Sequence, residues 1–312
     1  MAIKTLFLGS NWEALTTLKT LHQDSRFEIV GVITQPDKPT GRKQEILPTE
    51  VKQYCLDNNI PVFHTEKDEA KYQEALDTFK PELLVCKSFG EIIPEFFLEA
   101  PKYKAINIHF SLLPKYRGAI PIQKAILEGD SKTGISIVRM VKELDAGEVL
   151  ETFEEDILPT DTNQTLRERL VEKSSKVIGD ILMKWVAGEI KPIPQDESKA
   201  TFCWQKEISK DAAQINWSQH EPDYIEKMVR AMQPWPVAWS FFTEGRRMKI
   251  FKVEVIDNSD GQLQIEAGDF YTKEERLFVG TKNPLKLIQI LELQLEGKNR
   301  MSAAEFVRGQ DL

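Results

Sequence analysis

The first half of the chain alternates between short apolar runs and helix-like stretches, and this alternation constrains the fold more than any other feature. The runs are rich in β-branched and aromatic residues, which favour strands. They are IKTLFLG (3–9), FEIVGVIT (27–34), LLVCKSF (83–89), AINIH (105–109) and GISIVRM (134–140). Helix-like stretches lie near residues 12–22, 48–58, 67–79 and 119–129. The alternation predicts a Rossmann-like α/β domain with a mostly parallel sheet that helices cover on both faces.

The second half has a different pattern, as expected for a chain of 312 residues, which exceeds the usual single domain of roughly 100 to 200 residues. A long amphipathic helix is expected over 161–188, and the polar stretch that follows contains prolines. Beyond a helix near 221–232 come the short runs AWSFFT, RMKIFKVEVI, QLQIEA, RLFVGT and LKLIQILELQLE. They predict a small β-barrel similar to an OB-fold. We therefore predict a first domain over 1–188, a linker over 189–205 and a second domain over 206–312.

Composition and termini exclude several classes of protein. No apolar run approaches the roughly 20 residues of a membrane helix, and MAIKTLFLGS lacks the features of a secretory signal, so we expect a cytoplasmic protein. Cys55, Cys86 and Cys203 are far apart and have no CxxC spacing, which predicts reduced thiols and neither disulfides nor zinc. The net charge of -8 argues against a general nucleic-acid coat but leaves room for a local basic patch.

Polar side chains mark the predicted carboxyl ends of the strands, where ligands of α/β sheets bind. The first strand ends in Gly9-Ser10 without the G-x-G-x-x-G motif of dinucleotide-binding proteins. In the run AINIH, side chains alternate, so Asn107 and His109 share a face. Asp145 follows the next predicted strand, where a carboxylate could orient the imidazole and help to move a proton. An amide and an imidazole on one face could polarise an acyl carbon.

These residues resemble a known family. Asn107, His109, the run SLLP (111–114), Arg117-Gly118 and LDAG (144–147) are together similar to the formyl-tetrahydrofolate-dependent formyltransferases. Further similar blocks cover nearly the whole chain, among them TQPDKPTGR (34–42), SFGEIIP (88–94), RAMQPWPVAW (230–239) and LQLEGKNRMSAAEF (293–306). The last two are typical of the members that formylate methionyl-initiator tRNA.

The resemblance implies an enzyme that transfers the formyl group of 10-formyltetrahydrofolate to the free amino group of methionyl-initiator tRNA, for translation initiation. It further implies a monomer that needs no metal and does not bind membranes. The catalytic residues would be Asn107, His109 and Asp145. The folate site would be formed by Phe89, Gly90, Ile92, Ile93, Ser111, Leu112, Leu113 and Pro114. Candidate tRNA contacts are Arg42, Lys43, Lys206, Arg246, Arg247 and Lys249.

The chain departs from the family pattern in three places. Phe110 stands where the family commonly has glycine after the catalytic histidine. The familiar Gly-Thr-Pro-Asp-Phe near the amino terminus appears here as Gly-Ser-Asn-Trp-Glu, which ends at Glu13. The loop after QPDKPTGR is less basic than usual, with the sequence KQE at 43–45.

Two other functions remain open at this point. One is formylation of a nucleotide-linked amino sugar, which would use the same three residues. The other is a binding protein without enzymatic activity, in which these residues are structural. Taken singly, Asp145 is also typical of a turn, Ile92 and Ile93 of a core, and the basic run RRMK (246–249) of a solvated strand face.

Overall fold

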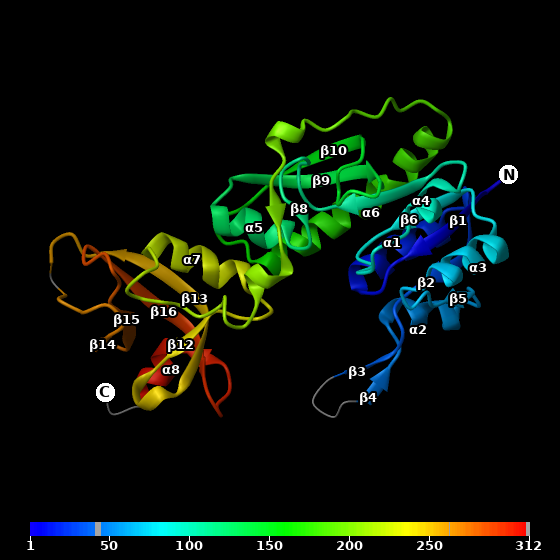
Figure 1. Ribbon diagram of the computed structural model, residues 1–312. Coiled ribbons are helices and arrows are strands. Elements are labelled where there is room, and N and C mark those ends of the chain that lie inside the picture. Colours follow the sequence, from blue (N-terminus) through cyan, green and yellow to red (C-terminus); the bar gives the residue numbers. More distant parts are fainter. Residues whose placement is uncertain (41–44, 262, 310–312) are drawn as a thin grey trace. The chain divides into compact units, whose positions relative to one another are not determined.

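The computed structural model describes residues 1–40, 45–261 and 263–309 (Figure 1). They divide into two compact units. Unit 1 comprises Met1–Gly118, Thr133–Glu155 and Glu168–Phe202, and unit 2 comprises Ala119–Lys132, Asp156–Arg167 and Cys203–Leu312. The chain therefore passes from one unit to the other more than once.

Unit 1 is built on a seven-stranded sheet. Its strands are β1 (Ile3–Leu8), β2 (Phe27–Ile33), β5 (Val62–Phe63), β6 (Leu83–Cys86), β7 (Ala105–His109), β9 (Lys132–Arg139) and β10 (Val149–Asp156). They lie in the order β10-β9-β7-β6-β1-β2-β5. β1 pairs in parallel with β2 and β6, and the pairs β2–β5 and β6–β7 are parallel as well. The predicted mostly parallel α/β sheet is confirmed.

Strand β9 is the exception, because it runs antiparallel to β7. Ile106 lies opposite Arg139, and His109 lies opposite Ser136. The loop 140–148 then leads into β10, an edge strand that the sequence analysis missed. Half of the residues of β10 are acidic, which protects a sheet edge but weakens the apolar alternation by which strands are recognised.

Helices pack around this sheet. They are α1 (Trp12–Gln23), α2 (Glu50–Asp57), α3 (Glu69–Phe79), α4 (Glu95–Glu99) and α6 (Asn163–Val186). The side chain of Asn11 caps α1 by accepting a hydrogen bond from the backbone N–H of Ala14 at 3.1 Å. The successive residues Leu6, Phe7 and Leu8 of β1 are at most 1% exposed, so both faces of this strand are covered.

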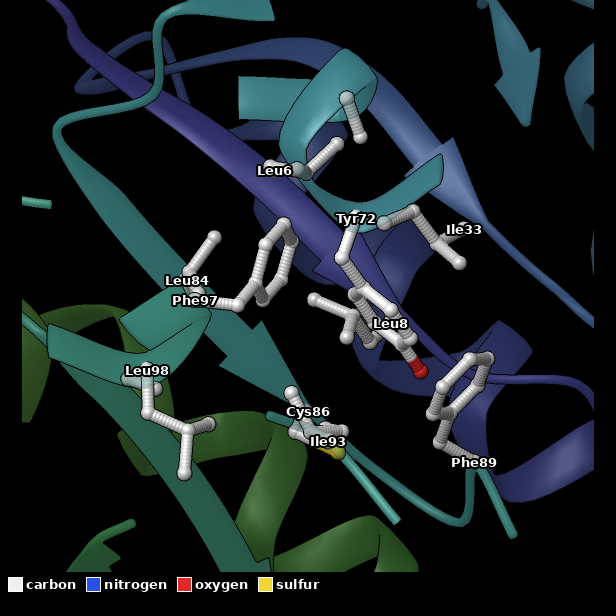
Figure 2. Packing of buried hydrophobic residues seen from close by; sticks show 12 residues of the cluster. Leu6, Leu8, Ile33, Tyr72, Leu84, Cys86, Phe89, Ile93, Phe97 and Leu98 are labelled. Atoms are coloured by element: carbon white, nitrogen blue, oxygen red, sulfur yellow. The ribbon is translucent and has the colours of Figure 1, made fainter. Parts of the chain in front are cut away.

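One core cluster lies between the sheet and helices α3 and α4 (Figure 2). The rings of Tyr72 and Phe97 meet edge to face with centroids 4.9 Å apart. Cys86 is buried in the same cluster, and burial raises the pKa of its thiol to about 12. Cys55 and Cys203 are also buried, and neither forms a disulfide.

Unit 2 contains an antiparallel sheet. Its strands are β12 (Trp239–Phe241), β13 (Arg247–Asp257), β14 (Phe270–Lys273), β15 (Arg276–Val279), β16 (Lys286–Leu295) and β17 (Met301–Ser302), and its helices are α5 (Pro121–Glu128), α7 (Pro222–Ala231) and α8 (Ala303–Arg308). The strands lie in the order β12-β13-β16-β15-β14, with β17 beside β16. The predicted strand QLQIEA is wrong over its described part, since residues 263–266 form none. This run has only three apolar residues among six, so its alternation was a weak signal.

The remaining elements are short. They are β3 (Lys38–Thr40), β4 (Glu45–Leu47), β8 (Arg117–Gly118), β11 (Phe202–Cys203) and 3₁₀ turns at Glu197–Lys199, Gln205–Ile208 and Thr243–Gly245. Within the part of the chain that the structure describes, no helix has the length and apolar character needed to cross a bilayer.

Candidate active site

The three predicted catalytic residues meet at the carboxyl end of β7. The Nδ2 atom of Asn107 lies 3.5 Å from Oδ1 of Asp145. The Nδ1 atom of His109 lies 3.6 Å from the other carboxylate oxygen, Oδ2. Both β7 side chains thus face one carboxylate, as the strand alternation predicted.

Asp145 reaches this position by a route that the sequence did not predict. Since β9 is antiparallel to β7, its carboxyl end lies beside the start of β7, away from His109. The loop 140–148 folds back along β9, so closely that a Cβ atom on Gly147 would lie 1.8 Å from the carbonyl oxygen of Arg139. Asp145 itself has a φ of 50°, a left-handed conformation that aspartate tolerates better than most residues.

Three hydrogen bonds hold this loop in place. The N–H of Gly118 donates to Oδ2 of Asp145 at 2.8 Å. The side-chain amide of Gln195 donates to the carbonyl oxygens of Asp145 and Gly147, each at 2.7 Å. Asp145 is therefore held through both its carboxylate and its backbone, as a positioned proton acceptor requires.

Arg117 supports the same loop indirectly, by holding Gln195. Its guanidinium is almost fully buried and donates to Oε1 of Gln195, at 2.9 Å from Nη2, and to both carboxylate oxygens of Glu197. Arg117 in turn lowers the pKa of the Glu197 carboxyl by hydrogen bonding. Gln195 and Glu197 were missed by the sequence analysis, because polar residues in a linker-like stretch carry no local pattern.

His109 is buried, and its protonation follows from its surroundings. Burial lowers the pKa of the imidazole, and the carboxylate of Asp145 opposes this shift only in part. Nε2 lies 2.9 Å from the carbonyl oxygen of Tyr116, which can only accept. The neutral ring therefore carries its hydrogen on Nε2 and presents the lone pair of Nδ1 to Asp145.

This lowered pKa predicts a pH dependence of stability. The unfolded chain, with a usual histidine pKa of 6.5, binds more protons than the folded chain as the pH falls. The contribution of His109 to the free energy of unfolding is thus fully present above that value and is lost as the pH falls towards the lower folded pKa. In urea titrations at about pH 7 and about pH 5, we expect His109→Gln to lose less stability on acidification than wild type. An equal loss in both proteins would contradict a neutral buried imidazole.

The SLLP run forms a tight loop after β7. The hydroxyl of Ser111 donates to the carbonyl oxygen of Lys115 at 2.5 Å. Ser136 of β9 links both ends of the run, because it donates to the carbonyl oxygen of Ser111 at 2.7 Å and accepts from the N–H of Leu113 at 3.0 Å. Leu112 packs against Gly134 of the same strand, and Pro114 is half-buried. Ser136, which the sequence analysis missed, is thus the residue that shapes this loop.

Family models match both parts of the chain. Residues 3–182 match the model described as formyl transferase, and residues 207–311 match the model of the formyl transferase C-terminal domain. The chain belongs to the formyl transferase family.

Individual formyl transferases are similar over nearly their full length. The methionyl-tRNA formyltransferase of Geobacillus sp. (strain WCH70) is 39% identical over 98% of this chain and 94% of the relative. That of Bacillus subtilis (strain 168) is 38% identical, with the same coverage of both chains. A solved N-formyltransferase from Helicobacter canadensis, in complex with folinic acid and dTDP-3-aminofucose, has a TM-score of 0.68 at 19% identity and covers 92% of this chain and 99% of its own. At this identity the structural match shows the shared formyl transferase fold alone.

The other residues predicted for the folate site differ in exposure. Phe89 and Ile93 are buried in the core cluster of unit 1 (Figure 2), where the carbonyl oxygen of Phe89 accepts a hydrogen bond from Gln35 at 3.0 Å. Ile92 is exposed, and Gly90 is exposed with a φ of 82°. The segment therefore presents Gly90 and Ile92 to solvent on top of an apolar core.

The predicted tRNA contacts that the structure describes lie in unit 2. Lys206, Arg247 and Lys249 are exposed, whereas Arg246 is half-buried beside Phe242. The guanidinium of Arg247 stacks at 4.1 Å from the ring centroid of Trp239 on the neighbouring strand β12. Arg42 and Lys43 lie outside the described residues.

No group of three or more histidine, cysteine, aspartate or glutamate residues that could hold a metal ion occurs among the residues described.

Proposed function

We propose that this formyl transferase moves the formyl group of 10-formyltetrahydrofolate to the free amino group of methionyl-initiator tRNA. The observation that carries the proposal is the meeting of Asn107, His109 and Asp145 at one strand end. The acceptor is supported by relatives named methionyl-tRNA formyltransferase, which match this chain over nearly its full length. A folate donor is supported by the family and by the folinic acid bound to the related N-formyltransferase.

The reaction is an acyl transfer in which protons must move. A bond forms between the amine nitrogen and the formyl carbon, and the bond from that carbon to the folate nitrogen breaks. Negative charge builds on the formyl oxygen, where pre-aimed hydrogen-bond donors stabilise the transition state. The amine nitrogen loses one proton, and the folate nitrogen gains one. The site must therefore supply donors and a proton carrier.

We assign these tasks to the three residues, and their geometry supports the assignment. The amide of Asn107 donates to the formyl oxygen, and Asp145 accepts the proton of the amine, directly or through water. Because Tyr116 holds the Nε2 hydrogen of His109, only Nδ1 faces the carboxylate. A proton taken up by Asp145 is passed to Nδ1, which donates to the formyl oxygen as the second donor. When the bond to the folate breaks, this proton moves to the folate nitrogen, so the site ends as it began.

Substrate binding is divided between the two parts of the chain. We assign the transfer and folate binding to residues 1–188, with 189–205 as a linker and 206–312 for tRNA. The pterin ring would lie against the 89–93 segment and the SLLP loop, since apolar walls with a few backbone donors suit a flat heterocycle. Arg42, Lys43, Lys206, Arg246, Arg247 and Lys249 would contact phosphates, so binding should weaken as salt increases.

The acceptor is tested by supplying the purified chain with 10-formyltetrahydrofolate and one of two amines. We expect formylation of methionyl-initiator tRNA and none of a dTDP-linked amino sugar, the kind of molecule bound to the structural relative. The control is the His109→Ala variant, which should lose the activity. If the sugar nucleotide is formylated while the tRNA is left unmodified, the proposed acceptor is wrong.

A further inference from the structure

A buried lysine lies directly behind the proposed active site. Lys87 follows the last residue of β6, and its side chain is only 4% exposed. An ammonium group loses its hydration when it is buried, so it is stable there only with close polar partners. The proposed reaction assigns it no task.

The Lys87 ammonium contacts a carbonyl oxygen, a carboxylate and an aromatic ring. Nζ donates a hydrogen bond to the carbonyl oxygen of Ile108 at 3.0 Å. It lies 3.6 Å from Oε2 of Glu13, a carboxylate whose side chain is also only 4% exposed. It also lies 3.1 Å from the ring centroid of Phe110, in a cation–π contact that burial strengthens.

Glu13 is itself held in place at the start of α1. Its Oε2 atom accepts a hydrogen bond from the hydroxyl of Ser88 at 3.2 Å, and Oε1 lies 3.5 Å from Nδ2 of Asn11. The cluster of Glu13, Lys87 and Phe110 thus joins α1 to the carboxyl ends of β6 and β7. This edge carries the proposed active site.

The contact with Ile108 places the cluster next to the reacting groups. Ile108 lies between Asn107 and His109, so its carbonyl belongs to the backbone that carries both side chains. A hydrogen bond from a buried, charged donor is stronger than a neutral one. It therefore restricts rotation of the peptide that sets the direction of the imidazole.

The cluster also explains two departures from the family pattern. Glu13 stands where the pattern ends in phenylalanine, and Phe110 stands where glycine is common. Both contact the same ammonium group in this chain. The two departures are therefore one coupled feature, with Lys87 as its centre.

We infer that Lys87 is a positioning residue for formyl transfer, which acts by fixing the end of β7 through Ile108 while Glu13 and Phe110 hold its ammonium. The charged groups that act on His109 are Asp145 on the folded-back loop and Lys87 at the end of β6. The inference rests on the proposed function for its kinetic test, but its structural test does not.

The test compares Lys87→Met with the double variant Glu13→Gln/Lys87→Met. Methionine has a similar length without charge, and glutamine can still bond to Ser88 and Asn11. The single variant leaves a buried carboxylate without its cation and should melt well below wild type. The double variant removes both charges, so its melting temperature should return towards that of wild type.

Activity should not return with stability. In the double variant we expect kcat to stay about 10- to 100-fold below wild type, with little change in KM for either substrate, because the reacting groups are misdirected rather than lost. The matched control is Lys173→Met, since Lys173 also donates to a carbonyl oxygen and contacts a glutamate, but at 36% side-chain exposure. Its kcat should equal that of wild type. Recovery of both stability and kcat in the double variant would overturn the positioning role.

A second measurement does not depend on the reaction. In NMR spectra of the double variant, the ring signals of His109 should shift, while those of His22, His64 and His220 should not. If the wild-type chain formylates no acceptor but His109 alone shifts, the proposed function fails, while the fixing of the end of β7 by Lys87 stands. Unchanged His109 signals would overturn the positioning role whatever the activity.

Discussion

Asp145→Asn is expected to lower kcat for formyl transfer by about 10²- to 10⁴-fold, the usual contribution of a positioned proton acceptor. Asparagine keeps the shape of the side chain, can accept the hydrogen bond from Gly118, and tolerates the left-handed backbone at this position. Its amide cannot take up a proton from the attacking amine. The melting temperature should therefore change little while kcat falls, as steady-state kinetics and calorimetry can show.

The matched control for this variant is Asp77→Asn. Asp77 is an exposed aspartate of α3 that accepts a hydrogen bond from Gln73. Its replacement should leave kcat unchanged and alter the free energy of unfolding by no more than about 0.5 kcal/mol. If Asp145→Asn retained kcat within the error of this control, the carboxylate would have no part in proton transfer.

Gly147→Ala is expected to have the second large effect, and it acts on the backbone. The added methyl group would lie 1.8 Å from the carbonyl oxygen of Arg139, much closer than two such atoms can approach. The loop that carries Asp145 must move away from β9, which breaks the contacts from Gln195 and Gly118. We expect a loss of at least about 1 to 3 kcal/mol in the free energy of unfolding, together with loss of activity.

Gly309→Ala provides the comparison for this variant. The nearest atoms to its added Cβ would be 3.6 and 3.7 Å away, an ordinary contact distance. Denaturant titration should therefore separate the two alanine variants clearly. Equal stability and activity of the two would mean that the loop does not depend on the close approach at Gly147.

Three non-glycine residues near the site share an unusual backbone conformation. Ser88, Tyr116 and Asp145 have φ values of 50°, 59° and 50°. Such conformations cost on the order of 1 to 3 kcal/mol each and persist where the surrounding structure enforces them. Here Tyr116 turns its carbonyl towards His109, and Ser88 turns its hydroxyl towards Glu13. The strain is thus located where side-chain direction matters for the proposed chemistry.

Local sequence patterns were sufficient to predict much of the fold and the residues at the centre of the site. The run AINIH matches β7 residue for residue, and its alternation placed Asn107 and His109 on one face. We predicted that Asp145 lies near the site because it follows a strand. The antiparallel direction of β9 was not predicted. No local pattern distinguishes a parallel from an antiparallel partner when the connection contains a helix and a turn.

The supporting residues could not be found in this way. Gln195 contacts Asp145 and Gly147 across about fifty positions of sequence, and it lies in a stretch with no periodicity. Lys87 falls at the end of an apolar run that reads as a strand through residue 89, whereas β6 ends at Cys86. Only the folded chain brings such polar groups to apolar surroundings and gives them fixed partners.

The most direct test of this account is the product of a single turnover. The purified chain is mixed with methionyl-initiator tRNA and a donor labelled in its formyl group, and the aminoacyl group is then released and identified by mass spectrometry. The account predicts labelled N-formylmethionine with the wild-type chain and its loss in Asp145→Asn. Unlabelled methionine with the wild-type chain, or full labelling with the variant, would contradict it.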